Sequence, residues 1–181
     1  IVQHKAVPGI DIFSSTVAGK DWIDHSWLVQ VIFYLMFRFA GPDGLIFLSA
    51  IIVVLAFLFL FLNAYRQRQF LTLSVAILFI TICASQVRFN IRPENFSILF
   101  FSLYLFILTR LAHKKWVFLL PLIQLIWVNA HGFFVFGPLL VGVFILAQSL
   151  KRTHLLPWEW GKTELLDRHT YRNLVRVFLL V

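Results

Sequence analysis

The sequence predicts an all-α fold, a polytopic bundle of helices embedded in a membrane. Hydrophobic residues make up 60% of the chain and charged residues only 13%, and the mean hydropathy is +0.86. A soluble domain of 181 residues could not cover that much apolar side chain with polar surface. The apolar residues also fall into runs about as long as a bilayer is thick, which is typical of membrane-spanning helices.

The chain begins with a polar outer loop, predicted over residues 1–43. Within it, residues 26–40 form an apolar segment that carries Gln30 and Arg38 and is closed by a Gly-Pro-Asp-Gly sequence at 41–44. This segment is shorter than the roughly 20 residues that a spanning helix needs, and such segments often lie along the membrane interface. We therefore predict an outer juxtamembrane helix over residues 26–40.

The transmembrane bundle is predicted over residues 44–150. The long apolar run after Trp116 exceeds one helix, and the polar sequence 129–132 divides it into a short helix and a longer one. The predicted spans are residues 44–64, 70–87, 96–112, 116–128 and 133–150. Residues 151–173, which contain tryptophans and mixed charges, are predicted to be a cytoplasmic connector, and residues 174–181 the start of a further span.

Charges between the spans predict the orientation. Alternating loops place one set of basic residues on a single side, which the positive-inside rule assigns to the cytoplasm: Arg66, Arg68, Arg110, Lys114, Lys115, Lys151 and Arg152. The acids before residue 159 fall on the opposite side, and they are Asp11, Asp21, Asp24, Asp43 and Glu94. Because charge near hydrocarbon is costly, we expect a functional site on this outer face of a multi-pass protein in the cytoplasmic membrane.

Composition and the ends of the sequence narrow the class further. The formal net charge is +8, but the basic residues are dispersed and no recognition motif accompanies them, so no nucleic acid is expected as a partner. Cys83 is the single cysteine and lies in an apolar run, so neither a disulfide framework nor a thiolate metal site is predicted. The absence of an initiator Met and the apolar end lead us to expect an interior part of a longer protein.

The first group of candidate site residues lies in the outer loop. Asp11, Asp24 and His25 are the catalytic candidates, and aromatic residues lie between them. Carboxylates can act as general bases or metal ligands, and aromatic rings suit the apolar faces of sugars. The alternative is structural: Asp11 belongs to a turn, and Asp24 is the N-cap of the helix that follows.

The second group, Arg88, Arg92 and Glu94, lies in the predicted outer loop between two spans. Arginines are disfavoured there by the positive-inside rule, and the planar guanidinium grips phosphate oxygens in pairs. They are therefore candidate ligands of a lipid-linked phosphate. The alternative is that Arg92 pairs with Glu94, or that both arginines extend to lipid headgroups.

The third group is Asn129 and His131, at the outer end of the short span. Gly132 permits a sharp turn there, and a histidine can orient a hydroxyl or transfer a proton. A structural cap is the alternative role for His131. A divalent metal has no support from spacing, since no HExxH, CxxC or DxD sequence is present; no metal ligand and no cofactor is predicted.

Several blocks of the sequence resemble a known group of membrane proteins. They look like the recurring blocks of bacterial proteins related to the GT-C glycosyltransferases, and more distantly like protein O-mannosyltransferases and lipid A aminoarabinose transferases. The resemblance covers about residues 8–150, and its blocks are DIFS at 11–14, WL at 27–28, GPDG at 41–44, RPENFS at 92–97 and WVNAHG at 127–132.

The resemblance implies a GT-C-like fold and a transferase that moves a sugar from a polyprenyl phosphate donor to an acceptor at the outer membrane face. An acid of the first outer loop would be the base, and basic residues would hold the donor phosphate. In these enzymes the essential acid commonly follows the first transmembrane helix, so it need not lie within residues 1–181. The expected partners are the polyprenyl-phosphate-linked sugar and membrane lipids, with the acceptor unassigned.

Two other functions are compatible with the sequence. A polytopic transporter or a flippase of lipid-linked sugars would use polar groups near the bilayer midplane, often on broken helices in repeated halves. The predicted spans contain few ionisable groups and no convincing repeat, so the transferase is the preferred hypothesis. A noncatalytic assembly subunit is the third, and only the 21 phenylalanines favour it.

Overall fold

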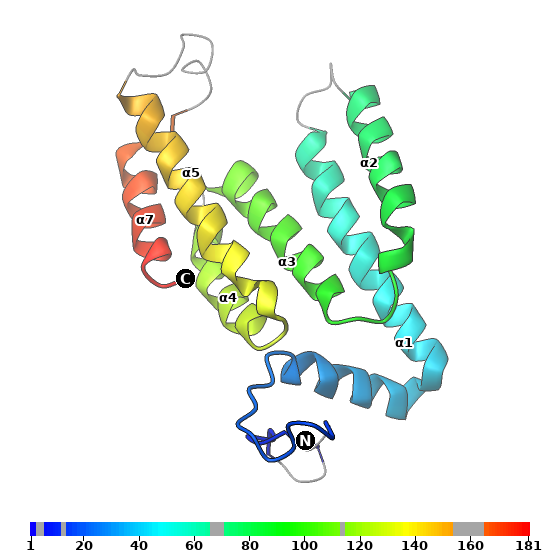
Figure 1. The fold of residues 1–181 in the computed structure, drawn as a ribbon. Coiled ribbons are helices and arrows are strands. Elements are labelled where there is room, and N and C mark those ends of the chain that lie inside the picture. The colour runs from blue at the N-terminus through cyan, green and yellow to red at the C-terminus, as the bar shows by residue number, and fades with distance from the viewer. Residues whose placement is uncertain (3–5, 12–13, 66–70, 113–114, 154–164) are drawn as a thin grey trace.

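The computed structural model describes residues 1–2, 6–11, 14–65, 71–112, 115–153 and 165–181. Over these residues the chain is helical and has no strand, which confirms the all-α prediction. A single isolated bridge joins Ile10 to Asp21 in the N-terminal arm. The longer helices are α1 (Trp27–Ala64), α2 (Leu71–Ser85), α3 (Glu94–Phe106), α4 (Leu120–Val128), α5 (Phe136–Arg152) and α7 (Arg168–Phe178) (Figure 1).

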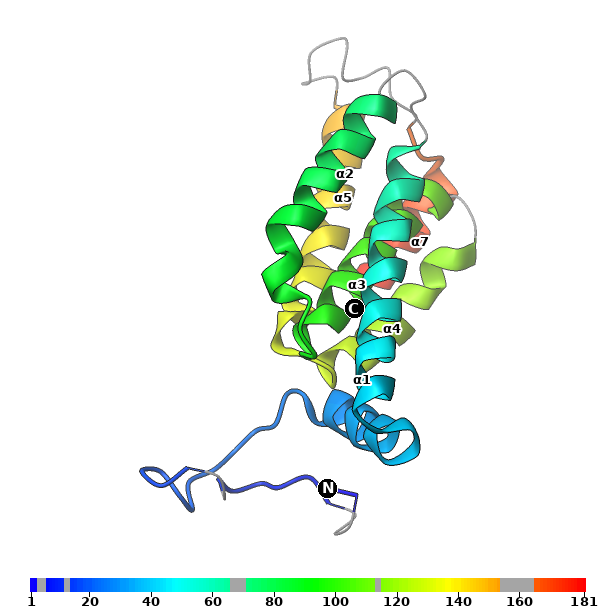
Figure 2. The same cartoon turned by 90° about the vertical axis from the view of Figure 1, so that its right-hand side faces the viewer.

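Helix α1 is broken at Gly41, where φ is 64° and ψ is −160°. A residue with a Cβ rarely adopts a positive φ of this kind, and Pro42 with its fixed φ suits the first turn of the helix that follows. The first half of α1 lies across one end of the other helices, and the second half runs alongside them (Figures 1 and 2). The predicted juxtamembrane helix, 26–40, is thus a separate helical segment that starts at Trp27.

The break also decides which part of α1 can cross a bilayer. At a rise of 1.5 Å per residue, residues 42–64 are roughly 34 Å long, close to the hydrocarbon thickness of about 30 Å. Three helical stretches of the described chain are long and apolar enough to span a membrane: Trp27–Ala64, Glu94–Leu111 and Gly132–Arg152. The predicted spans 70–87 and 116–128 correspond to shorter apolar helices, Leu71–Ser85 and Lys115–Val128.

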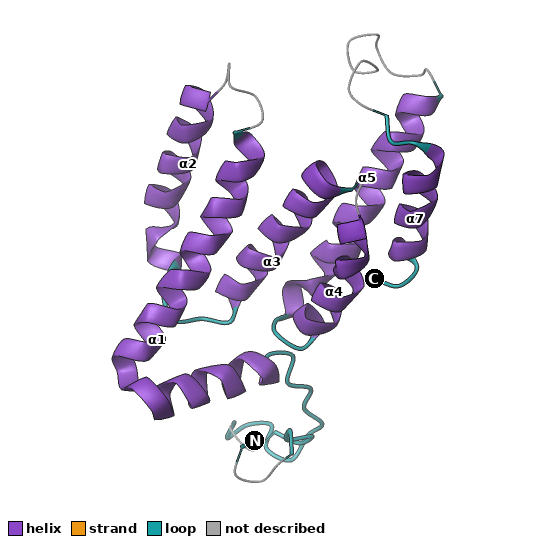
Figure 3. Ribbon diagram, turned by 180° about the vertical axis from the view of Figure 1, so that it is seen from behind, coloured by secondary structure: helices purple, strands orange, loops and turns teal. Residues whose placement is uncertain are grey.

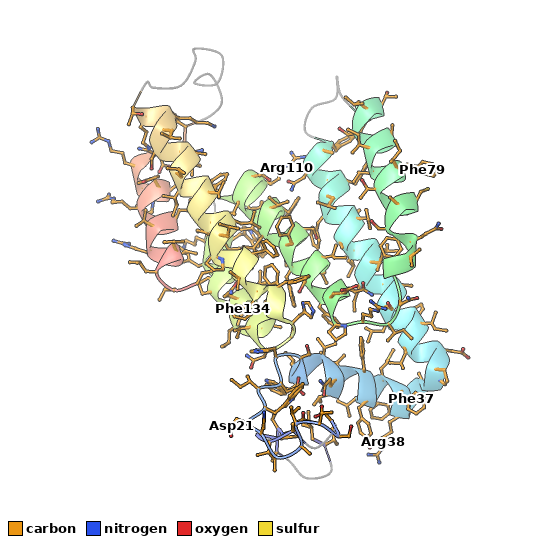
Figure 4. The ribbon with its side chains drawn as sticks, in the orientation of Figure 1. Asp21, Phe37, Arg38, Phe79, Arg110 and Phe134 are labelled. Carbon is orange, nitrogen blue, oxygen red and sulfur yellow. The ribbon has the colours of Figure 1, made fainter. Side chains whose placement is uncertain are left out.

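The core lies between α3, α4, α5 and α7. Tyr104 and Trp127 are its largest side chains and are both fully buried, and their rings pack edge to face with centroids 5.6 Å apart. Helix α1 packs against α3. Helix α2 has no buried residue, and its outward Phe79 is 66% exposed (Figure 4). Apolar surface on this scale suits lipid, not water.

Helices alternate in direction, so the connections gather at two ends of the bundle. The connection from α2 to α3 and the connection from α4 to α5 lie at the end that faces the first half of α1 (Figures 1 and 3). Arg110 lies at the other end (Figure 4), in a π-helical turn, η3 (Ile107–Leu111). Its guanidinium donates to the carbonyl oxygens of Leu62 and Asn63, which caps the last turn of α1 with a cation.

Helix α7 crosses residue 173, the predicted boundary between the connector and the further span. It begins at Arg168, inside the predicted connector 151–173, and ends at Phe178, inside the predicted span 174–181. The Asp167 side chain accepts a hydrogen bond from the Thr170 amide at 2.5 Å and so caps the helix. Mean hydropathy misses this helix because arginines on one face offset the apolar residues on the other. The predicted tryptophan loop lies mostly outside the described residues.

Candidate functional site

The first half of α1 and the corner between α4 and α5 are joined by hydrogen bonds. Helix α4 ends at Val128, and Asn129 is its C-cap. The Trp27 indole Nε1 donates to Asn129 Oδ1 at 2.8 Å, and the Leu28 amide donates to the Asn129 carbonyl oxygen at 3.1 Å. Asn129, a candidate site residue, therefore ties the juxtamembrane helix to the end of the bundle.

A hydrogen-bonded chain then connects α4 to His131 through Ser97. The Trp127 indole Nε1 donates to Ser97 Oγ at 2.9 Å, and Ser97 Oγ lies 3.1 Å from His131 Nδ1. The Phe133 amide also donates to His131 Nδ1, at 3.4 Å. Because the Phe133 amide donates to Nδ1, that nitrogen acts as an acceptor, and the Ser97 hydroxyl can donate to it as well. Neutral His131 then carries its proton on Nε2.

His131 lies beside Glu94 in a setting that disfavours its charged form. Desolvation by burial lowers the pKa of the His131 imidazole, and the negative charge of Glu94 opposes that shift. The ring also packs edge to face on Phe133, with centroids 4.7 Å apart. An imidazole held neutral around pH 7 can accept or relay a proton.

Glu94 is the first residue of α3, where its charge also suits the positive end of the helix dipole. Its Oε1 is buried and has no hydrogen-bond partner among the described residues. The nearest cation is the Arg92 Nη1, which lies 3.9 Å from Oε1, beyond hydrogen-bond distance. A buried carboxylate oxygen without a donor is costly, so it is a group that a ligand would satisfy.

A pocket of about 340 Å³ is lined by Glu94 and Ser97, and Ser97 Oγ is the atom that lies 3.1 Å from His131 Nδ1. Glu94 and Ser97 supply its polar groups, and aromatic rings from α3, α4 and the start of α5 supply most of the remaining wall. Convergent polar groups in an apolar, aromatic-lined concavity are the usual form of a small-molecule site.

A second, larger concavity of about 580 Å³ lies between α1, α2 and residues 89–91. It is apolar apart from Ser49 and Asn90. At this end the Asn95 side-chain nitrogen, Nδ2, donates to Ser49 Oγ at 3.1 Å and to the Asn90 backbone carbonyl oxygen at 2.7 Å. Asn95 is 2% exposed, and its Oδ1 has no hydrogen-bond partner among the described residues.

The outer-loop aspartates make local hydrogen bonds. Asp11 accepts from the Ser14 amide at 3.0 Å and from the Ser14 hydroxyl at 2.6 Å. Asp24 Oδ1 accepts from the Ser26 amide at 2.9 Å and from Gln30 Nε2 at 3.0 Å, at the start of α1. Asp11 thus has the turn role of the structural alternative, whereas the N-cap of α1 is Ser26 and Asp24 makes a turn-type bond just before it. His25 is exposed.

The predicted phosphate ligands differ in how far the structure describes them. Arg92 has a side chain that is 58% exposed, so its guanidinium is accessible at the end of the bundle. Arg88 ends a short 3₁₀ helix, η2 (Gln86–Arg88), and its side chain lies outside the described part of the chain. The Arg92 to Glu94 pairing, the structural alternative for this group, is present at 3.9 Å.

Sequence reasoning gave no role to Ser97 or Trp127 and treated Trp27 as a sugar-facing ring or an interface anchor, although all three belong to the blocks that carry the family resemblance. A serine in an apolar run reads as an ordinary packing residue, and tryptophans near a membrane interface read as anchors. Only the fold reveals that two indole N–H groups hold Asn129 and Ser97. The signal that could have found them is that each block gathers polar residues within a short stretch of chain.

In length and composition the helices are those of a helical membrane protein. The described residues contain no group of three or more His, Cys, Asp or Glu side chains arranged to hold a metal ion. Comparison with protein-family models, with curated proteins and with solved structures finds no match to the chain.

Proposed function

We propose that the protein is a membrane glycosyltransferase that moves a sugar from a polyprenyl phosphate donor to an acceptor at the outer membrane face. The resemblance of its sequence blocks to GT-C-type proteins suggests the reaction. One observation carries the proposal: three blocks distant in the sequence meet at one end of the bundle, through Trp27 and Asn129 and through Ser97 and His131.

Glu94 and His131 are the best placed groups for acid–base chemistry. The acceptor hydroxyl attacks the anomeric carbon and its proton passes to one of these groups. The bond from that carbon to the phosphate oxygen breaks, and its electron pair leaves with polyprenyl phosphate. A base must lie within hydrogen-bond reach of the proton it takes, and Glu94 Oε1 accepts no hydrogen bond from any described residue.

The donor requires both a phosphate ligand and room for an apolar chain. The exposed guanidinium of Arg92 supplies the first. The apolar concavity between α1 and α2 supplies the second, because it adjoins the residues that lead into α3 and its open side belongs to the lipid-facing surface. Asp24 has a local structural role in this scheme, since its Oδ1 accepts from the Ser26 amide and from Gln30 Nε2 beside the start of α1.

Sugar transfer from a synthetic polyprenyl phosphate donor by the full-length protein tests the proposal. We expect Glu94→Gln to lower kcat by at least about 100-fold, the usual scale for losing a general base. Arg92→Ala should raise KM for the donor. Asp24→Asn is the matched control: it also removes a carboxylate, and this variant should retain most of kcat. A Glu94→Gln enzyme with full kcat would exclude the base, and an Arg92→Ala enzyme with unchanged donor affinity would exclude the phosphate ligand.

A transporter or flippase of lipid-linked sugars is the second candidate, and the lateral apolar concavity favours it as well. The hydroxyl residues of α2 give it no support, because that helix has no buried residue and Thr81 Oγ1 donates back to the Ile77 carbonyl oxygen at 2.8 Å. Flux of a lipid-linked sugar through liposomes with no covalent product would establish this function in place of the transferase.

A further inference from the structure

A second polar site lies at the opposite end of the bundle, between α5 and α7. Arg152, Arg168, Tyr171 and Arg172 line a concavity of about 390 Å³. Three guanidinium groups on one small surface repel one another unless an anion lies among them. The site shares no residue with the pocket at Glu94 and Ser97.

Arg152 and Tyr171 form one wall of this site, and contacts with their neighbours hold both side chains in place. Arg152 Nη2 donates to the Leu166 carbonyl oxygen at 2.6 Å, and the guanidinium carbon lies 4.4 Å from the centroid of the Tyr171 ring. The Tyr171 hydroxyl lies 2.9 Å from Ser149 Oγ. The Arg152 Nε is buried and has no hydrogen-bond partner among the described residues. A guanidinium fixed in this way presents a constant geometry to a ligand.

Arg168 and Arg172 lie one helical turn apart on the exposed face of α7. Within the described chain the structure gives their guanidinium groups no hydrogen bond. Lys151, Arg152, Arg168, Arg172 and Arg176 are the described Lys and Arg residues from residue 151 onward, and Asp167 is the one described acid. Its carboxyl is engaged by the amide of Thr170, which lowers the pKa of Asp167.

We propose that this site binds the phosphate of an anionic phospholipid headgroup at the membrane surface. The buried half of α7, which includes Leu174 and Val177, joins the core of the bundle. That packing holds its arginine face alongside a bundle whose other surfaces are apolar and suited to lipid. Guanidinium forks match phosphate oxygens, and basic residues next to a spanning helix attract anionic headgroups.

Native mass spectrometry of the purified protein, titrated with phosphatidylglycerol, tests this assignment. The Arg168→Ala/Arg172→Ala variant should bind phosphatidylglycerol roughly 30-fold more weakly, the loss expected for two cations beside an anionic headgroup. These substitutions keep Arg152, whose hydrogen bond holds the end of α5, so the fold should survive. Wild-type protein should bind zwitterionic phosphatidylcholine much more weakly.

Arg176→Ala is the matched control, because it removes the same charge from the same helix face outside the pocket. It should change affinity by no more than about fivefold, the effect of one cation. Equal binding by the double variant and the wild type would overturn the proposal. So would an equal loss in the double variant and in Arg176→Ala, or displacement of phosphatidylglycerol by millimolar inorganic phosphate, which would indicate a site for a soluble anion.

Discussion

At the scale of single residues, His131 shows how a neutral imidazole is specified. Two donors, the Ser97 hydroxyl and the Phe133 amide, meet at its Nδ1, and a protonated imidazole could accept neither. Burial acts in the same direction, whereas the charge of Glu94 opposes it. The state of His131 thus depends on neighbours from two segments of the chain, the start of α3 and the turn that contains Phe133.

Removing the charge of Glu94 should lower the pKa of His131 further, because only burial and the two donors would then act on it. We expect Glu94→Gln to shift the imidazole titration to lower pH in an NMR titration of histidine-labelled protein, with His131→Asn used to assign the signal. Asp21→Asn removes an exposed charge from the N-terminal arm and should leave the titration unchanged. An upward shift in Glu94→Gln would contradict the electrostatic argument.

The same shift has a consequence for stability. The unfolded chain binds the His131 proton more tightly than the native protein does, because the native pKa lies below the ordinary value of about 6.5. Stability should therefore fall as pH drops below about 6.5 and level off below the native pKa. Above about 6.5 both states are neutral and this group contributes no pH dependence.

At the scale of helices, close approach of α4 and α5 depends on Gly137. A Cβ at Gly137 would overlap Gln124 Oε1 and would lie 3.3 Å from Tyr104 Cζ. Gln124 cannot move freely, since its Oε1 accepts from the Tyr104 hydroxyl at 2.8 Å and its Nε2 donates to the Phe134 carbonyl oxygen at 3.0 Å. Phe134 lies at the end of the bundle near the candidate site (Figure 4).

We therefore expect Gly137→Ala to destabilise the protein by about 1–3 kcal/mol, the range for overpacking a filled core. Denaturant-induced unfolding in detergent, followed by tryptophan fluorescence, measures the loss. Gly142→Ala is the control on the same helix, because its Cβ would meet only the ring edge of Phe178 at 3.3 Å, and that side chain is 40% exposed. Equal stability of the two variants would argue against tight packing at Gly137.

At the scale of the whole molecule, the charge pattern of the sequence and the arrangement of the helices both distinguish two ends of the bundle. The start of α3 and the corner between α4 and α5 belong to the end that the first half of α1 covers, and Arg110 and the end of α5 belong to the other (Figures 1 and 4). The positive-inside rule predicts that the end with Arg110 and Arg152 is cytoplasmic. The candidate glycosyl-transfer site and the proposed phospholipid site would then face opposite sides of the membrane.

Cysteine accessibility in intact cells tests this orientation. After Cys83 is replaced by alanine, Ala18→Cys in the N-terminal arm should react with a membrane-impermeant maleimide from outside. Thr153→Cys, after the end of α5, should react only once the cells are permeabilised; both positions are exposed. The reverse pattern would invert the topology and place the candidate site in the cytoplasm.

The sequence alone was enough to predict the helical membrane class, the separate helix before Gly41 and the polar corner at 129–132. These features depend on neighbours along the chain: long apolar runs, a glycine with a proline beside it, and short polar breaks. The helix that crosses residue 173 was not predicted, because an amphipathic helix has little mean hydropathy to mark it.

Only the tertiary structure decided which polar groups meet. Trp27 and Asn129 are 102 residues apart, and their hydrogen bond follows from the way in which α1 folds across the bundle. The same packing leaves Glu94 Oε1 buried without a donor, while Asp11 and Asp24, equally prominent in the sequence, are engaged by close neighbours. A side chain's type sets what chemistry it can perform, but its partners and its access to water depend on segments that only packing brings together.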